Sequence, residues 1–176
     1  MEISEQRRPE VLGDGRLELV DVDGGKAIRA TVGFAPGGVV AHFGIGSIVP
    51  APERYSIQIG ASRHILPDPD FLRFLNHSCA PNVLVDTAEM SVRALTRIEP
   101  GDSLEYFYPS TEWSMNEPFV CECGARDCLG GIRGAAYLAD DILARYRLSD
   151  HVARLARTRR RLRRGVPTPA WRVAAS

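Results

Sequence analysis

The sequence predicts a mainly β domain followed by an α-helical tail, and two patterns support this prediction. From Leu17 to Tyr108, short apolar runs are separated by Gly, Pro and Asp, as in β-strands joined by turns. After Gly134, apolar residues recur at helical spacing instead. The chain has 176 residues, of which 44% are hydrophobic and 25% charged. A chain of this size can bury a sizeable core, so disorder over most of its length is excluded.

Seven segments of the first part are expected to be strands, and several of them alternate apolar with polar side chains. Turn-forming sequences such as Asp23-Gly24-Gly25 and Pro36-Gly37-Gly38 separate them. Residues 1–16 are polar and are expected to form a loose end or an edge strand. The seven segments are LELVDV (17–22), AIRATV (27–32), GGVVAHF (37–43), YSIQIG (55–60), NVLVDT (82–87), MSVRAL (90–95) and SLEYFY (103–108).

Helices are expected in two places. A short helical turn should precede Asn76, where an apolar cluster spans residues 71–75. After Gly134, one helical face is formed by Leu138, Ile142, Leu143 and Tyr146. A second helix should begin beyond Ser149, which is the expected N-cap, because residues 152, 155 and 162 are apolar at helical spacing.

The charge is divided unevenly along the chain. Residues 1–144 carry 12 basic and 21 acidic side chains, whereas residues 145–176 carry 10 basic and 1 acidic. From Arg154 to Arg164, seven of eleven residues are arginine and none is acidic. Such a run can bind the phosphates of nucleic acid or another acidic partner. The alternative is a solvated helix end that folds back on the acidic body, and the sequence does not choose between the two.

No membrane or secretory segment is predicted. The longest uncharged stretch, residues 30–52, is interrupted by several glycines and prolines, whereas a membrane span needs about 20 predominantly apolar helical residues. The first ten residues are polar and lack the apolar core of a signal peptide. We therefore expect an intracellular, cytoplasmic and reducing location with no membrane partner. We also expect a bacterial source.

The four cysteines are arranged like metal ligands. Cys121, Cys123 and Cys128 form the pattern C-x-C-x4-C, and Cys79 stands 42 residues earlier. Zinc in structural sites takes four ligands in a closed tetrahedron, so these thiolates would complete one all-cysteine site. Disulfides or free buried thiols are the alternatives, but a reducing location and the tight C-x-C spacing argue against disulfides.

Three segments carry a resemblance to a known family. Residues 73–82 read RFLNHSCAPN and closely resemble the R-F-x-N-H-S-C-x-P-N signature of SET-domain lysine methyltransferases. Residues 99–108, EPGDSLEYFY, resemble their second signature, G-E-E-L-x-x-D-Y, and residues 121–130 match the post-SET pattern C-x-C-x4-C-x-G. All three lie in the order of the family, within roughly residues 17–137. The implied fold is the SET fold, a β-clip of short twisted sheets with a pseudoknot.

The resemblance implies S-adenosylmethionine as cofactor and a structural zinc ion. Cys79 of the first motif would join the three post-SET cysteines on zinc, which agrees with the cysteine count. The cofactor would contact the first motif and the early G-x-G segment of the family. The residues that match these segments are Arg73, Phe74, Asn76 and His77, and Gly25, Lys26 and Ala27.

The last tyrosine of the second motif is catalytic in the family, which is Tyr108 here. Tyr106 matches the position that sets how many methyl groups are added, and a tyrosine there resembles versions that favour lower methylation states. Methyl transfer needs an aligned and neutral amine, and a narrow apolar channel beside a sulfonium lowers the pKa of a lysine amine. Candidates for the channel wall are Phe74, Tyr106, Phe107, Trp113 and Phe119, although aromatic residues near a motif more often pack in the core.

Three departures from the family pattern are visible. Ala27 replaces the second glycine of G-x-G, and its methyl group would crowd the cofactor unless the backbone shifts. Phe107 replaces the aspartate before the catalytic tyrosine, which should change local hydrogen bonding. The region between Gly46 and Phe71 is short where histone-directed relatives carry a longer segment that reads the substrate peptide. Fold and cofactor are therefore more firmly implied than the substrate.

The sequence thus predicts an N-methyltransferase that acts on a protein lysine. Two alternatives stay open: an enzyme that methylates a small-molecule amine or other metabolite, and a binding module without catalysis. We divide the chain into an N-terminal extension (1–16), a SET domain (17–118), a post-SET zinc segment (119–134) and a helical, Arg-rich tail (135–176).

Overall fold

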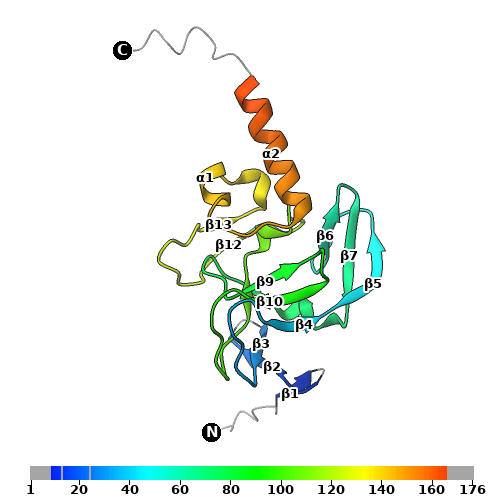
Figure 1. The fold of residues 1–176 in the computed structure, drawn as a ribbon, viewed down its shortest axis with the longest axis vertical. Helices are drawn as coiled ribbons and strands as arrows, with labels where there is room; N and C mark the ends of the chain where they lie inside the picture. The colour runs from blue at the N-terminus through cyan, green and yellow to red at the C-terminus, as the bar shows by residue number, and fades with distance from the viewer. Residues whose placement is uncertain (1–8, 13, 24, 166–176) are drawn as a thin grey trace.

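The described part of the protein is built from short strands rather than from one large sheet. A computed structural model describes residues 9–12, 14–23 and 25–165 (Figure 1). Within these residues, every sheet has only two or three strands, and helices are confined to short turns and the C-terminal end. The expectation of a mainly β fold with a helical tail is therefore confirmed. Among the described helices, none has the length and apolar character needed to cross a bilayer.

The N-terminal sheet contains β1 (Glu10–Leu12), β2 (Leu17–Val22) and β3 (Gly25–Ala30), which pair antiparallel in that order. Leu17 and Leu19 of β2 are buried, as is Ile28 of β3, so the alternation in LELVDV does mark a strand with one core face. The expected edge strand in residues 1–16 is confirmed as β1, whereas residues 1–8 lie outside the described part.

A second sheet forms the centre of the core. β10 (Ser91–Ala94) lies between β4 (Val39–His42) and β9 (Val83–Asp86), and both pairings are antiparallel. The main hydrophobic cluster includes Val40, Val83, Val85 and Val92 from these three strands. All three strands were expected from the sequence at nearly these positions.

A third sheet contains two strands that the sequence did not reveal. β7 (Arg63–Asp68) pairs on one side with β5 (Gly44–Val49) and on the other with the expected strand β6 (Ile57–Gly60). All but the last residue of β5 is exposed, so no core face imposes alternation on its glycine-containing sequence. β7 was not predicted because it contains Pro67, and proline is unusual within strands.

One parallel pairing brings two distant segments together. β8 (Asn76–His77) follows the 3-10 helix η1 (Asp70–Phe74), which is the expected helical turn, and pairs with β11 (Glu105–Tyr106). Asn82 fixes the same alignment: its Nδ2 donates to the Ser103 carbonyl at 2.7 Å and its Oδ1 accepts the Glu105 N–H at 2.9 Å. Residues 76–82 and 103–108 therefore lie side by side.

The strand expected over residues 103–108 is shorter than predicted. Only Glu105 and Tyr106 pair, and the chain then turns into the 3-10 helix η2 (Tyr108–Ser110). Pro109 favours this turn because its φ is fixed near the helical value and it has no N–H to donate to a ladder.

The C-terminal region begins with a two-stranded sheet of β12 (Phe119–Val120) and β13 (Gly131–Ile132), followed by the 3-10 helix η3 (Ala135–Tyr137) and α1 (Asp140–Leu143). The prediction of one helix through residues 138–146 is wrong outside α1, because α1 has only four residues. Tyr146 lies outside it because its ring stacks on Phe107 with centroids 3.6 Å apart and its hydroxyl donates to the Cys79 carbonyl.

The last helix, α2 (Asp150–Gly165), begins where the sequence indicated. The Ser149 Oγ accepts the backbone N–H of Val152 at 3.3 Å, which is an N-cap interaction. Val152 is fully buried and packs in a cluster with Ala135 and Leu143. The helix is therefore anchored at its N-terminal end and extends away from the rest of the chain (Figure 1).

The N-cap gives a stability prediction. Ser149→Ala removes the acceptor for the Val152 N–H and should lower the free energy of unfolding by about 1 kcal/mol, while Ser149→Thr, which keeps a hydroxyl, should lower it less. Urea unfolding followed by circular dichroism measures both. Equal stability of the alanine variant and the natural chain would contradict the assigned cap.

Candidate active site and metal centre

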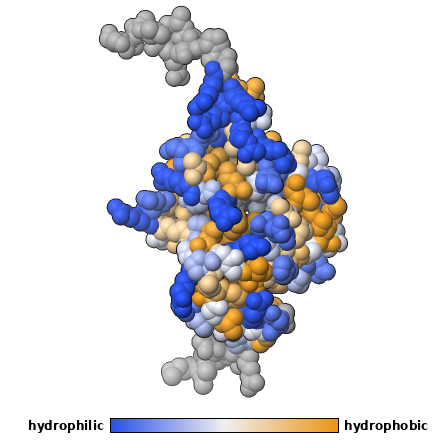
Figure 2. Space-filling model, viewed as in Figure 1, coloured by the Kyte–Doolittle hydropathy of each residue, from blue (hydrophilic) through white to orange (hydrophobic). Residues whose placement is uncertain are grey.

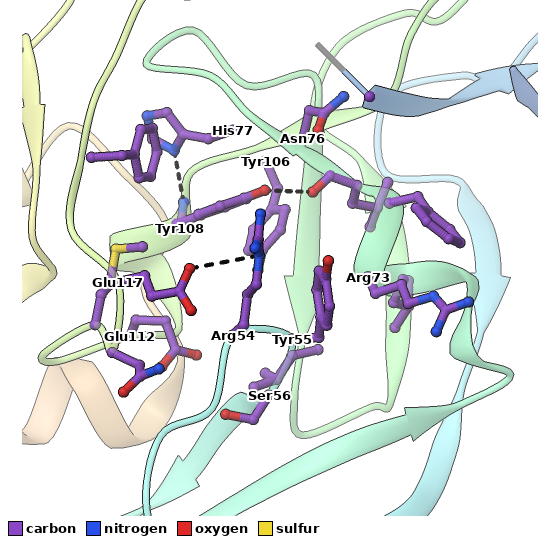
Figure 3. Close-up of a pocket in the computed structure, with 18 of the residues that line it drawn as sticks. Arg54, Tyr55, Ser56, Arg73, Asn76, His77, Tyr106, Tyr108, Glu112 and Glu117 are labelled. Carbon is purple, nitrogen blue, oxygen red and sulfur yellow. Dashed lines mark hydrogen bonds and ion pairs between the residues drawn. The ribbon is translucent and has the colours of Figure 1, made fainter. Parts of the chain in front are cut away.

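A single cavity of about 700 Å³ lies where several of the predicted segments meet. Its walls come from the start of β3, from η1 and β8, from β11 and η2, and from the loops around residues 53–57 and 115–123. Figure 3 shows side chains from these segments surrounding one space. The parallel pairing of β8 with β11 places the first motif beside the second.

Most of the predicted site residues line this cavity. They are Gly25, Lys26, Arg73, Phe74, Asn76, His77, Tyr106 and Tyr108. Ala27 does not line it, because the residue is buried in β3, where it pairs with Val20. The expected crowding of the cofactor by its methyl group stays a prediction. Of the five expected channel-wall aromatics, Phe107 and Trp113 also lie elsewhere, because Phe107 stacks on Tyr146 and Trp113 packs against the C-terminal cluster.

Asn76 and His77 are held by backbone groups from other elements. The Asn76 Nδ2 donates to the Lys26 carbonyl at 3.0 Å, which ties β8 to β3. The His77 Nδ1 accepts the Tyr108 N–H at 3.2 Å, and burial lowers the pKa of His77 to about 4. The imidazole is therefore neutral at pH 7, as an acceptor must be.

The two tyrosines form one aromatic pair at the base of the cavity. The Tyr108 hydroxyl donates to the Leu75 carbonyl at 2.8 Å, and the ring centroid of Tyr106 lies 4.7 Å from that of Tyr108. Burial raises the pKa of Tyr108 to about 12 and that of Tyr106 well above its usual value. Both groups are therefore neutral phenols. Because the proton of Tyr108 is committed to Leu75, its oxygen lone pairs are available to hold a polarised N–H or C–H group.

A buried acid in the same cavity was not predicted from the sequence. Glu112 is 7% exposed, and its Oε1 accepts the backbone N–H of Gln58 at 2.8 Å. Burial raises the pKa of Glu112 to about 7. Nearer the surface, Arg54 forms an ion pair with Glu117 at 3.6 Å (Figure 3). These residues belong to no recognised motif, and only folding brings them to the cavity.

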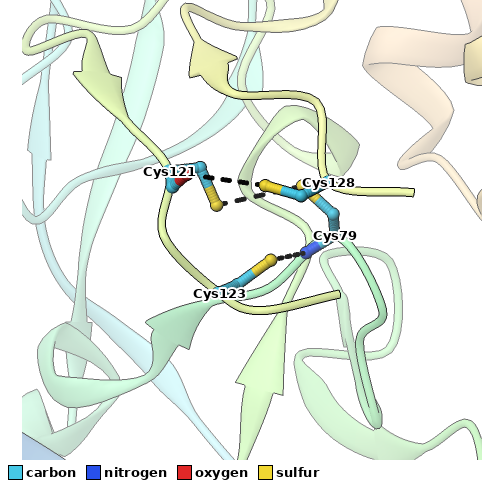
Figure 4. A group of neighbouring side chains, drawn as sticks. All are labelled: Cys79, Cys121, Cys123 and Cys128. Atoms are coloured by element: carbon cyan, nitrogen blue, oxygen red, sulfur yellow. Dashed lines mark hydrogen bonds between the residues drawn. The ribbon is translucent and has the colours of Figure 1, made fainter. Parts of the chain in front are cut away.

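The four cysteines converge as the spacing predicted (Figure 4). Their sulfur atoms all lie within 4.8 Å of one another, and the Sγ atoms of Cys79 and Cys121 are 3.9 Å apart. A disulfide needs about 2.05 Å, whereas zinc with Zn–S bonds of about 2.3 Å in a tetrahedron separates its sulfurs by roughly 3.8 Å. The arrangement therefore fits one zinc ion.

Backbone N–H groups support the cluster from outside. The Cys79 N–H donates to the Cys123 Sγ at 3.4 Å, and the Leu129 N–H donates to the Cys79 Sγ at 3.5 Å. Such donors stabilise metal-bound thiolates and orient them. Cys121 and Cys123 also line the cavity, together with the neighbouring Phe119. The metal centre is thus part of the cavity wall.

A family model described as the SET domain matches residues 17–109. The methyltransferase flvH of Aspergillus flavus is 41% identical over 113 residues, which are 61% of this chain and 62% of flvH. The H3 lysine-4 specific histone-lysine N-methyltransferase of Emericella nidulans is 37% identical over 65 residues, 33% of this chain and 5% of that protein. The chain thus spans less than two thirds of these curated relatives. Both are fungal, so they give no support to the expected bacterial source.

This chain is also similar to a solved structure. The crystal structure of KRYPTONITE in complex with mCHH DNA, H3(1-15) peptide and SAH has a TM-score of 0.52 and 25% identity. The match covers 65% of this chain and 29% of that chain.

The metal centre gives one prediction. Cys123→Ser should lose close to one equivalent of zinc per chain and destabilise the C-terminal third, because the binding energy of a structural zinc ion is folding energy. Glu122→Gln, a change at the adjacent exposed residue, should keep its zinc. Metal analysis of purified protein and thermal unfolding measure both effects. Full zinc content in the Cys123 variant would contradict the assigned ligand set.

Glu112 gives a pH-dependent prediction. Because its pKa is raised from 4.5 to about 7, the folded protein keeps a proton that the unfolded chain releases. The natural chain should therefore lose stability as pH rises from about 4.5 through 7. Glu112→Gln lacks this loss. Its free energy of unfolding, relative to that of the natural chain, should therefore increase by at most about 3 kcal/mol from pH 5 to pH 8.

Urea unfolding at both pH values measures this difference. Glu117→Gln is the matched control, because that carboxylate lines the same cavity but is exposed. A stability difference between Glu112→Gln and the natural chain that does not change with pH would contradict the raised pKa of Glu112.

Proposed function

Because the chain belongs to the SET-domain family, we propose that it is an S-adenosylmethionine-dependent N-methyltransferase that acts on the lysine side chain of a protein. The observation that carries this proposal is the convergence of Tyr108, Asn76 and His77 on one cavity whose wall contains a zinc-type cysteine cluster. The domain boundaries at residues 16, 118 and 134 stay part of the proposal.

The cavity suits the proposed cofactor. Its volume of about 700 Å³ is within the range of small-molecule sites. A Cβ atom at Gly25 would meet nothing within 4 Å, so this edge of β3 is open to a ligand. Aromatic and polar groups converge there, as a purine and an amino acid group require. The residues that would hold it are Gly25, Lys26, Arg73, Phe74, Asn76 and His77, and Ala27 supports them from within β3.

The cofactor supplies an electrophilic methyl group on a sulfonium. The protein must place an amine in line with it, because alignment can account for much of the rate enhancement. Tyr108 is suited to this role: its hydroxyl is fixed by Leu75, and its oxygen can orient the amine and contact the polarised methyl group. Tyr106 narrows the same space, and we assign it the role of limiting the number of methyl groups added.

The acceptor must lose a proton before transfer, since a lysine amine is almost entirely charged at pH 7. A buried cavity next to a cation lowers the amine pKa through desolvation and like charge. Desolvation is the largest cause of the raised pKa values of Tyr108 and Glu112, and the same desolvation would disfavour a charged amine beside them.

Protein lysine is favoured as acceptor by what is known of the similar proteins. The relative in Emericella nidulans is named as specific for histone H3 lysine 4, and the KRYPTONITE structure holds an H3 peptide with SAH. The match to flvH, whose name specifies no substrate, is longer and leaves a small-molecule amine as the competing outcome of the test.

Tyr108→Phe is the first test of the mechanism. It keeps the ring but removes the hydroxyl, so S-adenosylmethionine should bind with a Kd within about threefold of the natural value while turnover falls by at least about 100-fold. Tyr137→Phe, at an exposed position outside the cavity, is the control and should keep full activity. Unchanged turnover in the Tyr108 variant would refute its catalytic assignment.

The substrate is tested with S-adenosylmethionine carrying a labelled methyl group, incubated with a lysate of the source cell and separated into protein and small molecules. Label in protein lysine that depends on Tyr108 is the expected result. Label found only among small molecules would refute the lysine proposal while keeping the methyltransferase. Failure of the natural chain to bind the cofactor in calorimetry would instead favour a binding module without catalysis.

A further inference from the structure

Helix α2 carries seven arginines between residues 154 and 164, and the fold divides them among three faces of the helix. An α-helix advances about 100° per residue, so each side chain can be assigned to a face from its position. Burial then shows which face docks on the body and which faces solvent.

One arginine on the docking face is bound by the body. Val152 and Ala156 pack against the C-terminal cluster, and Arg159 lies one turn further along the same face. The Arg159 guanidinium binds the carboxylate of Asp140 and donates to the carbonyls of Ala135 and Ala136. The alternative in which the helix end folds back on the acidic body therefore holds for this residue.

Three arginines line a surface hollow together with Asp140 and Asp141. They are Arg160, Arg163 and Arg164. Arg159, Arg163 and Arg160 all lower the pKa of Asp140, Arg159 through its hydrogen bond as well as its charge. The positive charge of this side of the helix is thus partly balanced by the body.

Four arginines form an exposed stripe. Arg154, Arg157, Arg161 and Arg164 follow the 3-4-3 spacing of one helix face, opposite Val152 and Arg159, and all four are exposed. Two of them, Arg157 and Arg164, also line surface hollows that include Asp140. Within the described residues, no carboxylate lies within ion-pair distance of any of them. In Figure 2, strongly hydrophilic residues gather over the part of the molecule where Figure 1 places α2.

We propose that this arginine stripe binds the phosphate backbone of nucleic acid. The four guanidinium groups extend along about 15 Å of helix, a length over which one strand of a duplex presents about four phosphates. Arginine is well suited to phosphates because its guanidinium donates two parallel hydrogen bonds.

The composition of the stripe argues against other partners. Protein interfaces have apolar cores with aromatic anchors, and the stripe contains none. A membrane-surface helix needs a free apolar face, but that face of α2 is occupied by the body. Leu162 is the one large apolar side chain that the described part of α2 exposes. Backbone binding, in contrast, needs only positive charge in the right places.

This inference is independent of the proposed methyltransferase activity. None of the four arginines lines the cavity of about 700 Å³, so changes to the stripe should leave cofactor binding intact. Calorimetry with S-adenosylmethionine on each variant below therefore separates failure of the stripe from failure of the proposed function.

The test uses two double variants of the full chain that remove the same charge from the same helix. Arg157→Gln/Arg161→Gln removes half of the stripe, and Arg160→Gln/Arg163→Gln removes two arginines that line the hollow with Asp140 and Asp141 and lie outside the stripe. Binding of a fluorescein-labelled 20-base-pair DNA duplex is measured by anisotropy between 50 and 200 mM salt. Circular dichroism checks that both variants keep their helix.

For the natural chain, four phosphate contacts predict a slope of log K against log salt of about −3.6, or about a 150-fold loss of affinity over this range. The stripe variant should flatten the slope by about 1.8, and the control variant should leave it nearly unchanged. Arg157→Lys/Arg161→Lys should keep the natural slope. Equal slopes in the two glutamine variants would overturn the proposal, and binding of poly-glutamate without binding of the duplex would replace nucleic acid by an acidic protein.

Discussion

Four sulfur atoms from two distant segments meet at one point, and the cavity depends on this meeting. Cys79 follows β8, which carries Asn76 and His77, whereas the other three cysteines belong to the segment that forms the opposite wall. Within that segment, β12 and β13 pair over only two residues each. So short a pairing cannot order a wall by itself, because loop closure costs conformational entropy that a few hydrogen bonds do not offset. A metal ion that joins the segments would supply the missing energy.

The same cluster connects the cavity to the C-terminal helices. The Tyr146 hydroxyl donates to the Cys79 carbonyl, and the Tyr146 ring stacks on Phe107, which stands between Tyr106 and Tyr108. Phe107, one of the candidates for the channel wall, therefore does not line the cavity but links η2 to the loop before α2. The cavity and the helical tail are thus parts of one packed structure, while the outer face of α2 is left to solvent.

Local sequence patterns predicted much of this fold and failed for identifiable reasons. Strands with one buried face, such as β2 and β10, show their alternation directly. β5 does not, because its side chains are mostly exposed and its pairing with β7 decides its conformation. The cysteine count likewise predicted the four-cysteine cluster, including Cys79, and the family resemblance led to the same four residues.

The positions of two buried residues relative to the cavity could not be predicted from the sequence. Glu112 belongs to the cavity only because its loop returns beside Gln58, 54 residues earlier, and no spacing rule reports such a contact. Ala27 was expected to lie against the cofactor, but it is buried in β3, paired with Val20 of β2, and does not line the cavity. A strand position is assigned to one face by its register, and register is a property of the pairing.

The most direct test of this account is a calorimetric titration of S-adenosylmethionine into two samples of the natural chain, one loaded with zinc and one stripped of it by a chelator. We predict that the loaded sample binds one equivalent and that the stripped sample binds at least tenfold more weakly, with binding restored when zinc is added back. Equal affinity in the two samples would contradict the claim that the metal centre holds the wall of the cofactor cavity.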